Sequence, residues 1–148
     1  MNRVAKSRKP GNAYQNSPVT NAYSTNTASD NVLRIGCNSA ESFYVNGIYA
    51  ANKLHKTTTT NEEGLIVHTF TDFMGRAILE RITDGSTVMN TYYVYDDANF
   101  GHLKWVISPE GAKSLGTSGT YGKNDNLPKQ YCFYYQYNGA GDVVEKRD

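Results

Sequence analysis

A short turn unit recurs four times in this chain of 148 residues, and it constrains the fold more than any other feature. Each copy has Asp or Asn, two to four intervening residues, Gly, and an apolar residue within the next two positions; in three of the four copies a polar residue directly follows the Gly. An Asp or Asn side chain can accept hydrogen bonds from backbone N–H groups two residues on, and Gly tolerates the positive φ that such turns need. Each unit therefore predicts a hairpin turn. The predicted turn residues are Asn61, Gly64, Asp72, Gly75, Asp96, Gly101, Asn138 and Gly141.

The segments between these turns are rich in β-branched and aromatic residues, and several alternate in polarity. Such segments favour strands. Asp84-Gly85 is a strong signal for a two-residue hairpin, which we expect to contain a type I′ turn. A lone hairpin cannot bury its face, so the copies must pack on one another. The chain is therefore expected to be all-β and antiparallel. The expected strands are 57–60, 65–71, 77–83, 86–95, 102–107, 130–137 and 142–147.

The chain divides into three regions. Residues 1–31 are dominated by Asn, Ser, Thr and Ala and show neither strand nor helix periodicity, which predicts a tail that is disordered or lies extended on another surface. Residues 32–56 are expected to be irregular with short strands, and 50–56 is the only stretch with a helical tendency. Residues 57–148 form the hairpin-repeat region, interrupted by a long polar loop over 108–129.

Charge and hydropathy exclude several classes of protein. Fifteen Lys and Arg residues against fourteen Asp and Glu give a net charge of +1, so a broad basic surface for nucleic acid is not expected. No apolar run approaches the ~18 residues of a membrane span. The basic first residues are followed by a polar stretch rather than by the apolar core of a signal peptide.

No arrangement of reactive residues predicts catalysis, a metal or a cofactor. Cys37 and Cys132 lie far apart, and the three histidines are not at metal-ligand spacing. His68 alternates with Ile66 and Phe70, which is typical of a strand residue on a shared face. The glycine-rich segment 116–124 departs from a phosphate loop in spacing, and Pro128 would block the helix that such a loop requires.

Aromatic residues are the remaining candidates for ligand binding. The chain has twelve Tyr and one Trp, and sugars stack on exposed aromatic rings. Cross-strand packing explains most of them, because they fall at strand positions. Trp105 and Tyr134 are the carbohydrate-stacking candidates. Burial of these two side chains would favour a packing role, and an exposed coplanar row would favour binding.

The repeats resemble the YD repeat of the Rhs/teneurin class. The resemblance rests on Tyr95-Asp96-Asp97, Phe100-Gly101-His102-Leu103 and the trailing Pro109-Glu110-Gly111, and it covers about 46–148. It implies a segment of a spiralling β-sheet that closes as a hollow shell, often around a C-terminal toxin. It also implies an extracellular or cell-surface location and an association with carbohydrate. The sequence departs from the family's pattern in ending at Asp148, directly after a repeat, with no Asp-Pro-containing core segment and no toxin domain.

These features lead us to expect a truncated segment of an Rhs-like polypeptide. Its role would be to build the wall that encloses or presents another domain, and its partners would be the remainder of that polypeptide or further repeats. The alternative is a cell-surface carbohydrate-binding module that uses exposed aromatic residues. A third reading, an enzyme fragment, lacks a nucleophile and base at recognisable spacing.

Overall fold

A computed structural model describes residues 6–7, 19–39, 42–96, 101–122, 124–137 and 143–147. Over these residues the protein is mostly β, with two short helices, and its strands pair antiparallel. The expectation of an all-β, antiparallel fold is therefore confirmed. One isolated parallel bridge, between Cys37 and Asp96, joins the two sheets described below.

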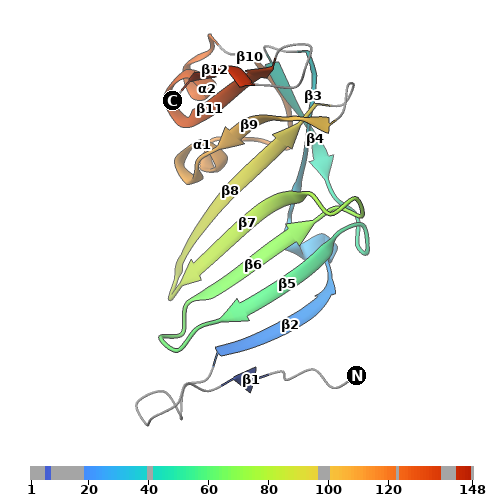
Figure 1. The fold of residues 1–148 in the computed structure, drawn as a ribbon, viewed down its shortest axis with the longest axis vertical. Helices are drawn as coiled ribbons and strands as arrows, with labels where there is room; N and C mark the ends of the chain where they lie inside the picture. Colours follow the sequence, from blue (N-terminus) through green and yellow to red (C-terminus); the bar gives the residue numbers. More distant parts are fainter. Residues whose placement is uncertain are drawn as a thin grey trace.

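The larger sheet has nine strands, and Figure 1 shows them stacked in order from β1 at the bottom to β12 at the top. From β5 to β9, neighbours in the sequence are also neighbours in the sheet, because each is joined to the next by a hairpin. The strands in sheet order are β1 (Lys6–Ser7), β2 (Val19–Thr25), β5 (His55–Thr60), β6 (Ile66–Thr71), β7 (Ala77–Asp84), β8 (Thr87–Tyr95), β9 (Leu103–Ile107), β11 (Cys132–Tyr137) and β12 (Val143–Arg147).

A second, smaller sheet covers part of the first. Its order is β10 (Ser118–Gly122), β4 (Ser42–Ile48) and β3 (Leu33–Ser39), and it lies beside the upper strands in Figure 1. The hydrophobic core includes residues from both sheets, with Phe43 of β4 packing edge-on against Trp105 of β9 at 5.2 Å between ring centroids. The buried core residues are Val32, Cys37, Phe43, Leu54, Phe70, Ile78, Leu79, Tyr92, Val94, Trp105, Ile107, Cys132 and Tyr134.

The lower strands of the large sheet form a single layer. Phe70 is the only buried residue of β5 and β6, and β2 has none. In β9, by contrast, three of five residues are buried: Lys104, Trp105 and Ile107. The molecule therefore has a two-layered upper part and an open lower part.

For residues 19–31 the prediction of disorder over 1–31 is wrong, whereas the alternative of an extended chain that lies on another part of the protein agrees with β2. Residues Val19–Thr25 form β2, which pairs along its whole length with β5, and Ala28–Asp30 form a 3₁₀ turn. The residues of β2 show no alternation in polarity because the strand lies on the open part of the sheet. Neither of its faces is buried there, so alternation is not required. The rest of the predicted tail, apart from β1, lies outside the described residues.

The predicted loop over 108–129 and the helical tendency of 50–56 are also wrong. The loop contains α1 (Pro109–Lys113), strand β10 and the start of α2 (Asn126–Tyr131). The Ser108 hydroxyl accepts from Gly111 N at the start of α1, and Pro109 occupies the first turn, where its missing N–H is harmless. Residues 50–54 form turns, and β5 starts at His55.

The β7–β8 hairpin differs from its prediction by one residue. Asp84 pairs with Thr87, so the two loop residues are Gly85 and Ser86. Gly85 has φ of 63°, and Ser86 has no positive φ. This pattern is that of a type II′ turn, which places Gly first, rather than of type I′.

Candidate functional site

Two of the predicted turns have the same hydrogen-bond geometry. Asn61 Oδ1 accepts from the backbone N–H groups two and four residues on, both at 2.9 Å, and Asp72 Oδ1 does the same at 2.9 Å. In both turns the glycine N–H donates to the Asx carbonyl, and Gly64 and Gly75 have φ of 86° and 87°. The Asx side chain therefore closes each turn, as the sequence pattern predicts.

The third turn lies beside the second, and an arginine connects them. Asp96 N donates to His102 O at 2.8 Å, and Gly101 has φ of 62°. A Cβ at Gly101 would lie 2.7 Å from Arg76 Nη1. Arg76 also donates from Nε to Asp72 at 2.8 Å, and its guanidinium lies over the Tyr95 ring. The fourth turn, with Asn138 and Gly141, lies outside the described residues.

Trp105 and Tyr134 are not accessible to a ligand. Both are 0% exposed, and their rings pack against each other at 4.8 Å between centroids. Phe43 of the small sheet covers Trp105 from the other side of the core. Neither ring can stack on a sugar, because the small sheet and the neighbouring strands exclude solvent from both. Because both side chains are buried, these two residues have a packing role.

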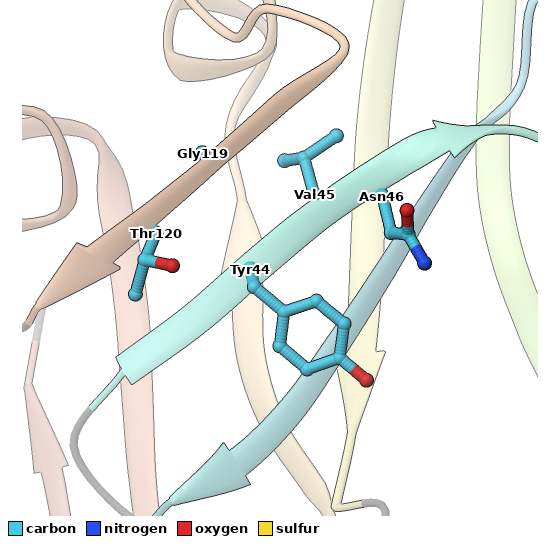
Figure 2. A pocket seen from close by; sticks show the side chains of 5 residues that line it. All are labelled: Tyr44, Val45, Asn46, Gly119 and Thr120. Carbon is cyan, nitrogen blue, oxygen red and sulfur yellow. The ribbon is translucent and has the colours of Figure 1, made fainter.

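A groove lies instead on the outward face of the small sheet. It consists of three adjoining hollows, which we call the outer groove. The first, of about 320 Å³, is lined by Tyr44, Val45, Asn46, Gly119 and Thr120. Figure 2 shows Tyr44 and Asn46 of β4 and Thr120 of β10 pointing to the same side, with Val45 pointing to the opposite side. This is the alternation of a strand with one face toward the core and one toward solvent.

The second hollow depends on a glycine opposite Tyr44. It measures about 160 Å³, and it shares Tyr44 and Asn46 with the first. Gly36 of β3 pairs with Tyr44, and a Cβ at Gly36 would lie 2.6 Å from Tyr44 Cζ. The absence of a side chain at Gly36 therefore lets the tyrosine ring lie across β3.

The third hollow is the largest, at about 510 Å³, and combines apolar and cationic groups. It shares Arg34 and Tyr49 with the second hollow. Phe73 is 63% exposed and belongs to the second predicted turn, between Asp72 and Gly75. The lining residues are Arg34, Ile48, Tyr49, Ala50, Lys53 and Phe73. Among the described residues that line the three hollows, the charged ones are Arg34 and Lys53, and none is acidic.

A buried asparagine holds the loop that supplies one wall of the third hollow. Asn26 is 1% exposed, and its Oδ1 accepts from Lys53 N and Leu54 N at 2.8 Å. Its Nδ2 donates to Ala50 O at 2.9 Å. Fully paired buried polar groups of this kind fix backbone position. Asn26 therefore fixes loop 50–54 against the end of β2.

A threonine and a histidine form a cross-strand contact on the open part of the large sheet. Thr58 Oγ1 and His68 Nδ1 are 2.8 Å apart across β5 and β6, and His68 shares a face with Phe70. Burial, together with Lys56 and Arg81, lowers the pKa of His68. A lowered pKa suits a neutral, hydrogen-bonded strand residue.

The described residues include neither a metal-binding cluster nor a membrane-spanning helix. No cluster of three or more His, Cys, Asp or Glu side chains there is suited to hold a metal ion. No helix in the described part of the chain is long and apolar enough to cross a membrane.

Comparisons with known proteins give no relatives. No protein-family model, curated protein or solved structure matches the chain.

Proposed function

We propose that the chain is a non-catalytic wall segment of a β-shell of the Rhs/YD-repeat type, which encloses or presents another domain. The observation that carries this proposal is the large sheet itself. Successive hairpins extend it strand by strand, and equivalent Asx turns join β5 to β6 and β6 to β7. A sheet that grows by recurrent hairpins is suited to form a wall, because each hairpin presents a pairing edge to the next.

The open edge of the sheet supports the same role. Among the described strands, β12 pairs only with β11, so its other side faces no described strand. Exposed edges of this kind template further pairing. In the proposed wall, the partner at this edge is a strand of the remaining polypeptide or of a further repeat.

The first test is the oligomeric state of the chain in solution. Light scattering after size-exclusion chromatography should show self-association that increases with protein concentration, because open edges pair with one another. A monomer at every concentration, with a sharp cooperative β-type melt, would contradict the wall proposal, since it would mean that the chain completes its own fold.

A pair of edge variants sharpens this test. Val144→Pro and Glu145→Pro each remove one backbone N–H from β12, and consecutive N–H groups of a strand point to opposite sides. One variant therefore removes an outward N–H and should reduce self-association with little change in Tm. The other removes a hydrogen bond to β11 and should lower Tm. If both leave self-association unchanged, the β12 edge is not the contact.

A further inference from the structure

We propose that the third hollow of the outer groove docks an acidic peptide segment of a partner protein. The segment would place an apolar side chain against Ile48, Tyr49 and Phe73 and a carboxylate at Arg34 and Lys53. The hollow combines residues of the small sheet and loop 50–54 with Phe73 from the β6–β7 turn, and the inference does not rest on the wall role proposed for the large sheet.

Charge complementarity favours an anionic partner. Arg34 and Lys53 have no acidic partner among the described residues. Three other described cations are neutralised by an acidic neighbour: Lys56 pairs with Asp30, Arg76 with Asp72 and Lys113 with Glu110. Two uncompensated cations on one hollow attract an anionic group and reject a cationic one.

Apolar exposure at the same place favours a partner with an apolar anchor. Ile48 is 36% exposed and Phe73 is 63% exposed, and both line the hollow. Met74, next to Phe73 in the turn, is 78% exposed. Exposed apolar groups bordered by polar ones are typical of docking surfaces, where burial of an anchor side chain supplies most of the binding free energy.

The orientation of the aromatic rings favours a peptide over a sugar. Sugars stack on open ring faces, but the Arg34 guanidinium lies over the Tyr49 ring at 5.9 Å from its centroid. The Phe73 ring packs at an angle of 65° against His55, and Tyr44 lies against Gly36. These contacts occupy part of the ring surface, whereas the exposed Ile48 and Phe73 side chains can still contact an aliphatic or aromatic side chain.

The backbone around the hollow is held before any partner arrives. Asn26 fixes the loop that holds Ala50 and Lys53, and Tyr49 N donates to Val32 O at 2.8 Å. The Asx turn at Asp72 fixes the hairpin that presents Phe73. A preorganised site loses less conformational entropy on binding than a flexible one.

The test is an NMR titration of the ¹⁵N-labelled full chain with the peptide acetyl-Glu-Glu-Phe-Glu-amide. Amide signals of Tyr49, Lys53 and Phe73 should shift, and the affinity should fall as salt is raised, because screening weakens attraction between exposed charges. The double variant Arg34→Ala/Lys53→Ala should bind about tenfold more weakly, the size expected when charges on one side of such an interface are removed.

The matched control is Lys113→Ala/Lys129→Ala, which removes the same charge from the two helices and should leave the affinity unchanged. Equal binding of acetyl-Lys-Lys-Phe-Lys-amide would overturn the proposal, as would an equal loss in the control variant. If a galacturonate oligosaccharide shifts these signals and the acidic peptide does not, the site takes an acidic sugar and the peptide proposal is wrong.

Discussion

At the scale of single residues, the two Asx turns hold a neutral and an ionised side chain in the same geometry. Asn61 and Asp72 both accept from two backbone N–H groups at 2.9 Å, but only Asp72 also pairs with an arginine, Arg76. Burial alone would raise the pKa of Asp72, but hydrogen bonds from Arg76 and Met74 and the charge of Arg76 outweigh it and hold the pKa below its ordinary value. The Asp72 turn is therefore sensitive to acid, and the Asn61 turn is not.

The first residue-scale prediction concerns pH. Because the pKa of Asp72 is depressed in the folded state, its stabilisation is present above the unfolded pKa of about 3.9 and is lost as pH falls through the folded value. Asp72→Asn keeps the backbone acceptor and removes the charge. In urea unfolding, the stability difference between wild type and this variant should shrink between pH 7 and pH 3. Asn61→Asp is the converse control and should gain sensitivity to acid.

A truncation at the same site measures the hydrogen bonds rather than the charge. Asp72→Ala should cost about 1–2 kcal/mol more than Asp72→Asn at pH 7, because two turn N–H groups lose their acceptor. Equal costs for the two variants would show that the Asx contacts contribute nothing to the free energy of unfolding.

At the scale of elements, the close contact of β3 with β4 depends on the pairing of Gly36 with Tyr44. Gly36→Ala would place a Cβ 2.6 Å from Tyr44 Cζ, so the ring must move out of the groove. Overpacking of this kind costs roughly 1–3 kcal/mol. In a Tyr44→Ala background the same substitution should cost almost nothing, since the clash is gone and Ala suits a strand better than Gly. Urea unfolding of the four proteins tests this coupling, and an equal cost in both backgrounds would refute it.

The strands of the repeat region could be predicted because their signals are local. Alternation and the Asx-Gly turns indicate β5 to β9, β11 and β12, and the structure has a strand at each of these places. Tertiary pairing determines the remaining elements. The two-residue loop starts at Gly85 rather than Asp84 because the register of β7 and β8 places Asp84 opposite Thr87. Strand β10 forms because residues Ser118–Gly122 pair with β4, which is more than seventy positions earlier in the chain.

The outer groove could not be predicted for the same reason. Its third hollow joins Arg34 of β3, the loop that holds Lys53 and the turn that holds Phe73, and no sequence spacing links the three. The predicted aromatic candidates failed because a strand pattern shows which residues share a face but not which face is covered. Trp105 and Tyr134 lie on the covered face. The sequence contained one signal for this groove: Phe73 and Met74 are hydrophobic residues within a predicted turn. Both are exposed in the structure.

At the scale of the whole molecule, stability should be unevenly distributed along the sheet. The upper strands of the large sheet lie beside the small sheet (Figure 1). They contain Val94, Trp105 and Ile107, all 0% exposed, whereas β5 has no buried residue. Regions with few buried apolar contacts open at lower free energy than the core. The lower strands should therefore open separately, before the molecule unfolds as a whole.

Hydrogen exchange followed by mass spectrometry tests this gradient. Amides of β5 and β6 should exchange at least about tenfold faster than those of β8 and β9, a ratio that corresponds to about 1.4 kcal/mol in opening free energy. Trp105→Phe should speed exchange in β8 and β9 and leave β5 and β6 nearly unchanged, because the lower strands open while the core around Trp105 stays packed. Thr58→Ala, which removes the contact with His68, should speed exchange in the lower strands. Uniform protection along the sheet would mean instead that the open strands and the covered strands unfold as one unit. In that case cross-strand pairing alone, without a second layer, stabilises the lower wall.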